Sequence, residues 1–378
     1  MSQYTFELYR PDLQRQVAEL QKAYWGSSIK LNTAYLEWKY SRNPYTSGPL
    51  LYVAMRGSRL VGMRGIFGTS WEVGPRPETV VLPCTADTVI EPNYRGRGLY
   101  RDFSEFMMAD LRSRGYTHTF SLSSTPANYV ISVISLGYRP VGSLGIMTRR
   151  SPSATVDTKL IKLVNKFNLA SMVQRVSMDA RRALGINVFS DLDRNAGNDS
   201  AAAGFPVTLA NKPRPEAMAD LVRRLNKDER IRHVRDRTYF SWRFENPRAS
   251  YRFLYGESDH LDGYLVLQNT KGKSPVNIAD WEASDPDVRA GLFRSALSWG
   301  QFSRIEIWNA TLPAAEGELL REAGFSAIED IPGTPRHYGR FLLRTVGNVE
   351  DDRNWCLHGR QLLKLGNWDL RMIYSDGF

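Results

Sequence analysis

The sequence predicts an α/β fold made of two copies of one unit, and two observations lead to this class. In the first half of the chain, a β-branched apolar run leads through a glycine-rich loop into a helical pattern, which is the order strand, loop, helix. Motifs of this half then recur in the same order in the second half. A chain of 378 residues is long for one domain and sufficient for two.

The repeat begins with an aromatic segment that ends in Asn-Pro. This segment reads YLEWKYSRNP over residues 35–44 and YFSWRFENP over residues 239–247. Each copy continues into two runs with the composition of strands, at 51–55, 60–63, 251–255 and 264–267. Each copy therefore leads from the aromatic segment into two strand-like runs.

The later part of each copy repeats as well. Asp87 precedes Gly98 by the same interval that separates Asp280 from Gly291. Each copy then closes on a short motif of a small or apolar residue, glycine and an aromatic residue, Leu-Gly-Tyr in the first and Ala-Gly-Phe in the second. One such match could be chance, but several in the same order indicate a duplication.

The loop between strand and helix in the first copy has the composition of an anion site. The helical spacing begins at Leu99, directly after the loop. The first N–H groups of a helix have no partners within the helix, and the helix dipole favours negative charge at this end. Gly96 and Gly98 would let a phosphate approach these groups, and Arg95 and Arg97 add guanidinium donors.

The spacing Ile-x-Pro-x-x-Arg-Gly-x-Gly, which begins at Ile90, resembles motif A of the GNAT superfamily of acyl-CoA N-acyltransferases. A helical run that opens at Asn128 and closes in Leu-Gly-Tyr is similar to the end of that domain. The resemblance covers about residues 50 to 145. It implies two tandem GNAT-like units, each a mixed, mostly antiparallel central sheet flanked by helices, in an enzyme that uses acetyl-CoA or another acyl-CoA.

The resemblance also implies where the cofactor binds. In the family, the strand before the loop pairs with pantetheine and the loop binds the pyrophosphate. The matching residues are Thr88, Val89, Ile90, Arg95, Gly96, Arg97, Gly98, Leu99, Tyr100 and Asn128. Two departures from the family pattern are Tyr100, where a small residue is usual, and Val133, where many members carry a tyrosine as general acid. For Asn128, an ordinary helix N-cap is the alternative role.

The second copy lacks the phosphate loop. Ala290 replaces the phosphate-side glycine, and Asp285 and Asp287 place negative charge where a pyrophosphate would lie, so Coulomb repulsion opposes CoA there. We expect a cofactor-binding GNAT domain at 1–150, a helical linker or insertion at 151–205, and a degenerate GNAT-like domain with a C-terminal extension at 206–378. The insertion holds a basic amphipathic run, which we expect to pack on the protein itself rather than on a membrane.

Acyl transfer requires a deprotonated amine, so a carboxylate near the reacting groups is useful. Asp87 lies on the strand that leads to the loop and is the candidate catalytic base. Its counterpart Asp280 in the degenerate copy favours a structural role as the alternative. Glu91 lies at the end of the strand and is a poorer candidate. We expect Cys84 to be a buried small hydrophobe rather than a nucleophile.

Composition predicts a soluble, cytoplasmic enzyme without a metal. Apolar residues make up 42% of the chain, the net charge is +10, and no apolar run approaches the roughly 18 residues of a membrane span. The first residues carry early charges and no apolar core of a signal peptide. The two cysteines and five histidines show neither a disulfide framework nor metal-ligand spacing. Since no nucleic-acid fold signature is present, we expect no DNA partner.

These expectations combine into an N-acyltransferase that moves an acetyl group from acetyl-CoA to a primary amine by direct attack on the thioester. The repeated aromatic and Asn-Pro motifs resemble those of tandem GNAT proteins of bacterial cell-surface polysaccharide biosynthesis and of the FemAB-like group, so an amino sugar is the favoured acceptor. One alternative is a FemAB-like or carrier-dependent transferase, whose donor would be an anionic aminoacyl-tRNA or acyl carrier protein. The other is a non-catalytic protein that binds CoA or a glycan.

Overall fold

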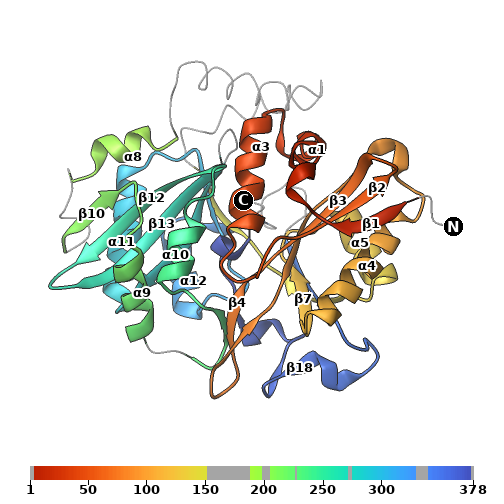
Figure 1. The fold of residues 1–378 in the computed structure, drawn as a ribbon. Helices are drawn as coiled ribbons and strands as arrows, with labels where there is room; N and C mark the ends of the chain where they lie inside the picture. Colours follow the sequence, from red (N-terminus) through yellow and green to blue (C-terminus); the bar gives the residue numbers. More distant parts are fainter. Residues whose placement is uncertain are drawn as a thin grey trace, which may run out of the picture.

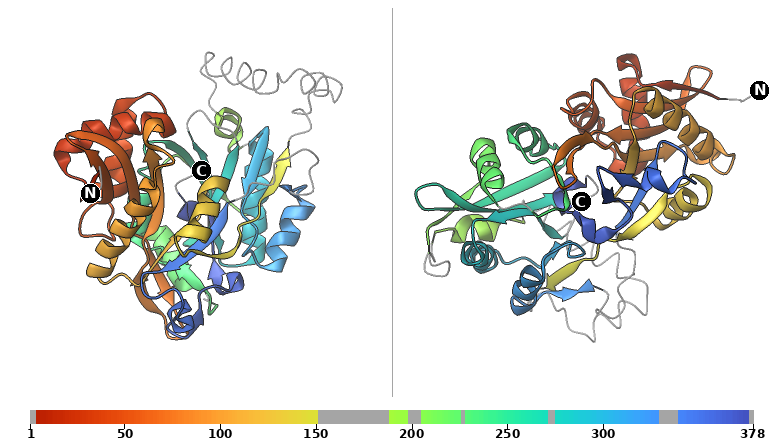
Figure 2. Two further views of the ribbon diagram at one scale, coloured as in Figure 1. Left: turned by 90° about the vertical axis from the view of Figure 1, so that its right-hand side faces the viewer. Right: turned by 90° about the horizontal axis from the view of Figure 1, so that it is seen from below.

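The computed structural model describes residues 4–150, 188–197, 205–225, 228–270, 275–328 and 339–375. These residues form two seven-stranded sheets that lie side by side, each with helices packed on it (Figure 1 and Figure 2). Both sheets are mostly antiparallel and contain a parallel pair. The predicted α/β class with mixed sheets flanked by helices is therefore confirmed.

The first sheet has the order β1-β2-β3-β6-β7-β17-β8. Its strands are β1 (Thr5–Leu8), β2 (Leu50–Arg56), β3 (Arg59–Phe67), β6 (Cys84–Ile90), β7 (His118–Ser121), β8 (Arg139–Ser143) and β17 (Arg340–Thr345). Its helices are α1 (Gln14–Leu20), α2 (Lys22–Trp25), α3 (Ile29–Leu36), α4 (Leu99–Ser113) and α5 (Pro126–Ser135). Successive residues of a strand point to opposite faces. In β2 one alternating set packs with α1 and α3, and the other packs with α4.

The second sheet has the order β10-β12-β13-β14-β15-β9-β16. Its strands are β9 (Met147–Arg150), β10 (Val207–Ala210), β12 (Ala249–Glu257), β13 (Leu261–Thr270), β14 (Val276–Ala283), β15 (Arg304–Ile307) and β16 (Ser326–Ala327). Its helices are α8 (Ser190–Asn195), α9 (Pro215–Arg224), α10 (Arg237–Arg243), α11 (Pro286–Trp299) and α12 (Ala314–Glu322). The core of this unit lies between the sheet, α11 and α12.

The two sheets exchange one strand each. β17 comes from the second half of the chain and lies between β7 and β8 of the first sheet, while β9 comes from the first half and lies between β15 and β16. Both sheets therefore have the same topology, with the sixth position filled by the other half. This supports the inferred duplication, and it means that sheet membership crosses the domain ranges 1–150 and 206–378 at two strands.

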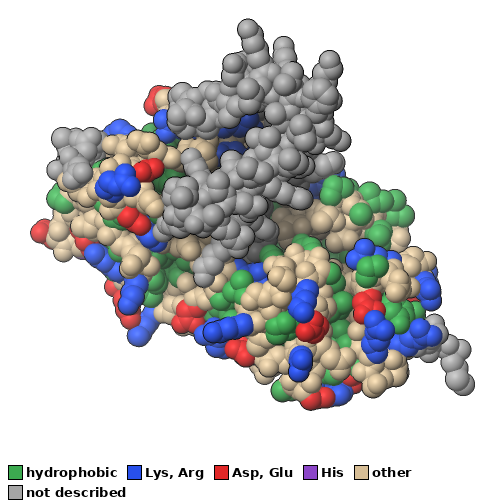
Figure 3. Space-filling view, turned by 90° about the horizontal axis from the view of Figure 1, so that it is seen from above, with side chains coloured by type: hydrophobic (Ala, Val, Ile, Leu, Met, Phe, Trp, Pro, Cys, Tyr) green, Lys and Arg blue, Asp and Glu red, His purple; other side chains and the backbone are tan. Residues whose placement is uncertain are grey.

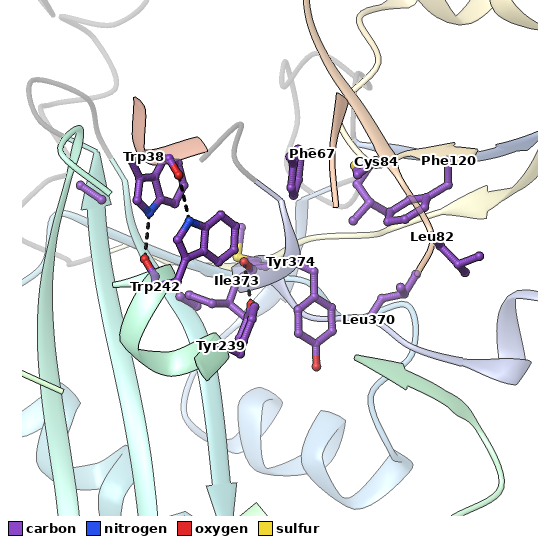
Figure 4. Packing of buried hydrophobic residues seen from close by; sticks show 14 of the residues in the cluster. Trp38, Phe67, Leu82, Cys84, Phe120, Tyr239, Trp242, Leu370, Ile373 and Tyr374 are labelled. Atoms are coloured by element: carbon purple, nitrogen blue, oxygen red, sulfur yellow. Dashed lines mark hydrogen bonds between the residues drawn. The ribbon is translucent and has the colours of Figure 1, made fainter. Parts of the chain in front are cut away.

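The repeated aromatic segments meet each other at the centre of the molecule. Trp38 Nε1 donates to the Trp242 carbonyl at 2.8 Å, and Trp242 Nε1 donates to the Trp38 carbonyl at 2.9 Å (Figure 4). The two rings stack with centroids 5.2 Å apart and an interplanar angle of 12°. The two hydrogen bonds are therefore equivalent, with the donor and acceptor residues exchanged. The same reciprocity is found at a two-fold axis between identical subunits.

The first copy has one more residue between this tryptophan and Asn-Pro than the second. The extra residue is accommodated by a π-helical turn, η2 (Glu37–Ser41), whereas α10 is regular at the equivalent place. After it, the Asn43 and Asn246 side chains accept from the backbone N–H two residues later, at 2.9 and 3.0 Å. The two copies therefore keep the same turn despite the insertion.

A third sheet joins the two halves in the order β20-β11-β4-β5. Its strands are β4 (Ser70–Val73), β5 (Glu78–Val81), β11 (Ile231–His233) and β20 (Trp368–Asp369). A small hairpin of β18 (Cys356–Leu357) and β19 (Arg360–Gln361) precedes β20. The short 3₁₀ turns are η1 (Pro11–Leu13), η3 (Pro92–Tyr94), η7 (Asp352–Trp355), η8 (Leu365–Asn367) and η9 (Met372–Tyr374). The C-terminal extension up to residue 375 contributes β17, the hairpin, β20 and η9 to this arrangement.

Most of the predicted helical insertion at 151–205 lies outside the described part of the chain, and within it the structure describes residues 188–197, which contain α8, and residue 205. Among the described helices, none has the length and apolar composition required to cross a bilayer.

Candidate active site

The parallel strands β6 and β7 separate along the first sheet. Among the described residues their ladder consists of Cys84 opposite Phe120, and Thr85 Oγ1 donates to the Phe120 carbonyl at 3.1 Å. β6 nevertheless continues to Ile90. The second half of β6 therefore has an edge that β7 does not cover, which places a gap in the middle of the sheet.

A β-bulge accompanies this separation. The register of β3 against β6 shifts between Met63 and Gly65, so that Asp87 and Thr88 together face Arg64. Asp87 has a φ of 42°, a left-handed conformation that is uncommon for a residue other than glycine. Bulges bend a strand and re-aim its side chains, and they are frequent beside active sites.

A polar cleft of about 50 Å³ lies in the gap between β6 and β7. Its walls come from both faces of the sheet, since Tyr24 lies on α2 while Tyr100 and Asn128 lie on α4 and α5. The lining residues are Tyr24, Arg64, Thr85, Ala86, Asp87, Thr88, Tyr100, Ser121, Ser123, Ser124, Asn128, Ser132 and Tyr138. Most of these carry a hydroxyl, an amide or a charge, so the cleft offers hydrogen bonds rather than an apolar surface.

The backbone of β6 directs alternate groups toward β3 and away from it. The Glu91 N–H donates to the Val61 carbonyl of β3 at 3.0 Å. In an antiparallel ladder, Val89 then also directs its backbone toward β3, and Ile90 directs its own away from β3. The Ile90 carbonyl accepts a hydrogen bond from Arg95 Nε at 2.9 Å. The family resemblance implies that Thr88, Val89 and Ile90 bind the cofactor. Of these three, Val89 pairs with β3 through its backbone.

The loop before α4 has the conformation that its glycines predict. Gly96 and Gly98 have φ values of 73° and 79°, which a residue with a side chain rarely adopts. Gly98 is the N-cap of α4 and has no side chain to occupy the first N–H groups of the helix. Arg95 and Arg97 are exposed beside it, whereas Leu99 is buried in the core. The structure therefore places a helix N-terminus without a side-chain cap, together with two exposed arginines, directly before Tyr100, which lines the cleft.

Asn128 lies one turn inside α5. The N-cap of this helix is Thr125, whose Oγ1 accepts from the Asn128 backbone N–H at 3.3 Å. The alternative role of Asn128 as an N-cap is therefore wrong, and the residue lines the cleft together with Tyr100. Val133 packs in an apolar cluster with Tyr100, and the neighbouring Ser132 lines the cleft.

Asp87 is buried and fully engaged by donors. Its Oδ2 accepts from Lys39 Nζ at 2.9 Å and from the Tyr40 hydroxyl at 2.6 Å, and its Oδ1 accepts from Trp25 Nε1 at 3.1 Å. The Lys39 and Asp87 side chains are 0% and 1% exposed. These contacts tie the bulge to α2 and η2. They favour the structural alternative, and the assignment of Asp87 as catalytic base stays a prediction.

In the second unit, side chains of the protein itself occupy the places that match the open edge of β6 and the N-terminus of α4. Counted from the equivalent aspartates, Trp281 holds the place of Thr88, and its carbonyl accepts from Arg371 Nη1. Arg371 also pairs with Asp280 at 3.4 Å. At the start of α11, Asp285 Oδ1 accepts from the N–H groups of residues 287 and 288 at 2.9 and 3.0 Å. Both the strand edge and the helix N-terminus are thus occupied by the protein itself.

Nine of the thirteen cleft residues lie outside the set expected from the sequence, and Arg64 and Tyr138 are among them. Arg64 is the charged residue within the apolar run 60–67, and this interruption of a buried strand was the available signal. Tyr138 belongs to the closing Leu-Gly-Tyr motif. That motif indicated the family resemblance and the repeat, but it did not indicate a role for the Tyr138 side chain in the cleft. Glu91, the weaker candidate base, is held by Arg59 Nη2 at 2.9 Å, and Cys84 is buried as expected.

Comparison with known proteins agrees with this geometry. A family model described as an acetyltransferase (GNAT) domain matches residues 229–322, in the second unit. Among solved structures, a GCN5-related N-acetyltransferase from Anabaena variabilis is 14% identical, with a TM-score of 0.57 over 91% of this chain and 73% of that protein. One from Kribbella flavida is 14% identical, with a TM-score of 0.55 over 91% and 72%. A probable N-acyltransferase from Enterococcus faecalis is 12% identical, with a TM-score of 0.57 over 91% and 73%. Likenesses at such identities describe the fold alone, and no curated protein matches the sequence.

Proposed function

We propose that the chain is a GNAT-superfamily N-acyltransferase that moves an acetyl group from acetyl-CoA to the primary amine of an amino sugar. The observation that supports this most is the asymmetry of the two units. The first has an open strand edge that leads to an uncapped helix N-terminus, while the second has its own side chains at both positions. The proposal therefore places the cofactor in the first unit.

In this proposal the pantetheine arm adds to β6 as a further strand along Thr88–Ile90 and replaces Arg95 Nε as the partner of the Ile90 carbonyl. The pyrophosphate lies at the loop 95–98, because backbone N–H groups and the helix dipole favour an anion there. Arg95 and Arg97 contribute guanidinium donors. Leu99 anchors the start of α4 in the core, and Tyr100 and Asn128 contact the pantetheine side of the ligand.

The residues at the mouth of the cleft support an amino sugar as the acceptor substrate. Tyr24 lines the cleft and is 53% exposed, and its ring meets Trp25 edge-on at 4.9 Å. An exposed aromatic ring beside hydroxyl groups suits a sugar, which has an apolar face and a polar rim. On the face drawn in Figure 3, Lys and Arg side chains lie among Asp and Glu rather than in one basic stripe. This favours a small substrate over a tRNA.

The reaction is a direct displacement. The amine nitrogen attacks the thioester carbonyl, the C–N bond forms, the C–S bond breaks, and the amine loses a proton to water or to a group of the cleft. A backbone N–H at the open edge of β6 would stabilise the negative charge that develops on the carbonyl oxygen. A cytoplasmic location and a role in polysaccharide biosynthesis belong to the same proposal.

Calorimetric titration of acetyl-CoA tests the proposal, with wild type and the Gly98→Glu variant. Glutamate would place a side chain and a negative charge at the helix N-terminus, so we expect binding to fall at least tenfold. Gly115→Glu is the matched control. Gly115 has the same φ of 79°, has open space around it, and lies just beyond the other end of α4.

Binding that is lost in Gly98→Glu and kept in Gly115→Glu supports the assignment and justifies a screen of amines with amino sugars first. Equal binding by both variants would refute the loop assignment. No binding of acetyl-CoA by wild type would refute the donor and redirect the search to carrier-bound acyl groups.

A further inference from the structure

A buried guanidinium without a carboxylate partner lies in the cleft of the first unit. Arg64 is 2% exposed and lines the cleft from β3. Its Nη1 donates to Ser104 Oγ at 2.7 Å, its Nη2 approaches the Tyr138 hydroxyl at 3.5 Å, and its guanidinium lies 4.8 Å from the centre of the Tyr100 ring. Within the described part of the chain no acidic side chain forms an ion pair with Arg64, and its Nε has no hydrogen-bond partner.

A second arginine approaches the same tyrosine from the exchanged strand. Arg344 of β17 has its guanidinium 5.9 Å from the centre of the Tyr138 ring, and its Nε also lacks a partner. β3 and β17 lie on opposite sides of the gap between β6 and β7. Tyr138 is therefore flanked by two cations at the place where the sheet opens.

Such an arrangement is unfavourable for folding alone. Removing a charge from water costs several kcal/mol unless a partner compensates it, so buried ions are normally paired. A cation that faces a cleft without an internal partner is instead suited to a negative charge supplied by a ligand or formed during a reaction. In the proposed reaction the leaving group is a thiolate, which acquires a full negative charge as the C–S bond breaks.

We propose that Tyr138 protonates the departing CoA sulfur and that Arg64 positions and polarises its hydroxyl. This inference rests on the proposed function. The C–S electron pair stays on sulfur, the Tyr138 hydroxyl proton passes to it, and the resulting phenolate is stabilised by Arg64 until a proton from water replaces it. Because the Arg64 N–H points to the phenol oxygen, the hydroxyl proton of Tyr138 remains free to face the cleft.

The thiol of bound CoA provides a test that needs no acceptor. Thiolate absorbs in the ultraviolet, so CoA bound at saturation can be titrated with pH on wild type, Arg64→Met and Tyr138→Phe. A cation and a hydroxyl donor near the sulfur should increase the ionisation constant of the thiol at least tenfold relative to free CoA. Arg64→Met should remove most of this increase, and Arg64→Lys should restore part of it because the charge returns. Tyr52→Phe is the control, since the Tyr52 hydroxyl donates to Asp110 outside the cleft.

Turnover gives the second readout. With an accepted amine, Tyr138→Phe should lower kcat about 100-fold, as expected for loss of a general acid, and remove one limb of the pH profile while desulfo-CoA affinity is kept. A bound thiol that ionises like free CoA, or a Tyr138→Phe variant with wild-type kcat and pH profile, would overturn this inference and leave the proposed function intact. Failure of wild type to bind CoA would overturn both.

Discussion

Replacing Trp38 or Trp242 with phenylalanine should destabilise the protein by nearly equal amounts, because the contact between them is reciprocal. Each indole donates to the other residue's carbonyl, at 2.8 and 2.9 Å, and the rings stack at 5.2 Å. Either substitution leaves one buried carbonyl without its donor, which costs about 1–3 kcal/mol. Weaker stacking adds about 0.5–1.5 kcal/mol. We expect a loss of about 2–4 kcal/mol in the free energy of unfolding for each single variant.

The double variant decides whether the two residues act as a pair. Since both single variants weaken the same ring stack, the double variant should lose about 1 kcal/mol less than the sum of the two. Urea unfolding measures all four proteins, and Trp299→Phe serves as control because Trp299 is equally buried but lies in the core of the second unit alone. Strict additivity, or single variants that differ by more than about 2 kcal/mol, would refute the reciprocal contact as the link between the halves.

Three further outcomes are expected. Burial lowers the pKa of His233 to about 3 from 6.5, so the unfolded chain binds a proton there that the folded protein does not. Stability should therefore fall as pH drops below 6.5, by up to about 4 kcal/mol, and melting curves of His233→Phe should lack this slope between pH 6.5 and 4. For Asp369, burial alone raises the pKa, but Arg371 and then Arg235 lower it to about 2 from 3.8. Its contribution is complete above pH 3.8 and is lost as pH falls toward 2, so Asp369→Asn should flatten the acid limb of the melting temperature; an unchanged limb would contradict this. Arg371→Met removes a cation that pairs with the buried Asp369 and with Asp280 and Glu282, of which the last two keep Arg235. It should cost about 3–5 kcal/mol in urea unfolding, whereas a loss below about 1 kcal/mol would contradict the role of Arg371 in filling the second unit.

Local sequence was sufficient for the parts of the site that depend on neighbouring residues. Gly96 and Gly98 predicted a loop before a helix because their left-handed conformations are disfavoured for other residues. Asp285 predicted negative charge at the equivalent loop, and it caps α11 there. Asn128 was placed correctly on a helix, but its position relative to the cap was uncertain because helix ends shift by a residue or two with small changes in capping.

The sequence could not place residues whose role depends on distant segments. Arg64 and Tyr138 lie far apart in the chain and meet only because β3 and the segment after α5 face the same cleft. Arg371 reads as an ordinary charge near the end of the chain, yet it reaches the Trp281 carbonyl. Such contacts depend on packing over long sequence separations, which no local pattern encodes.

By itself, then, the sequence determined the α/β class, the repeated units and the loop with its helix N-terminus, because hydrophobic period, glycine geometry and charge act over a few residues. Only the tertiary structure decided that β9 and β17 lie in each other's sheets, since this pairing joins segments that are far apart in the chain and no local pattern specifies it. Tertiary structure also decided which unit keeps an open strand edge. That choice follows from where the C-terminal segment packs, because the buried Arg371 pairs there with Asp280, which lies 91 residues earlier in the chain, and with Glu282.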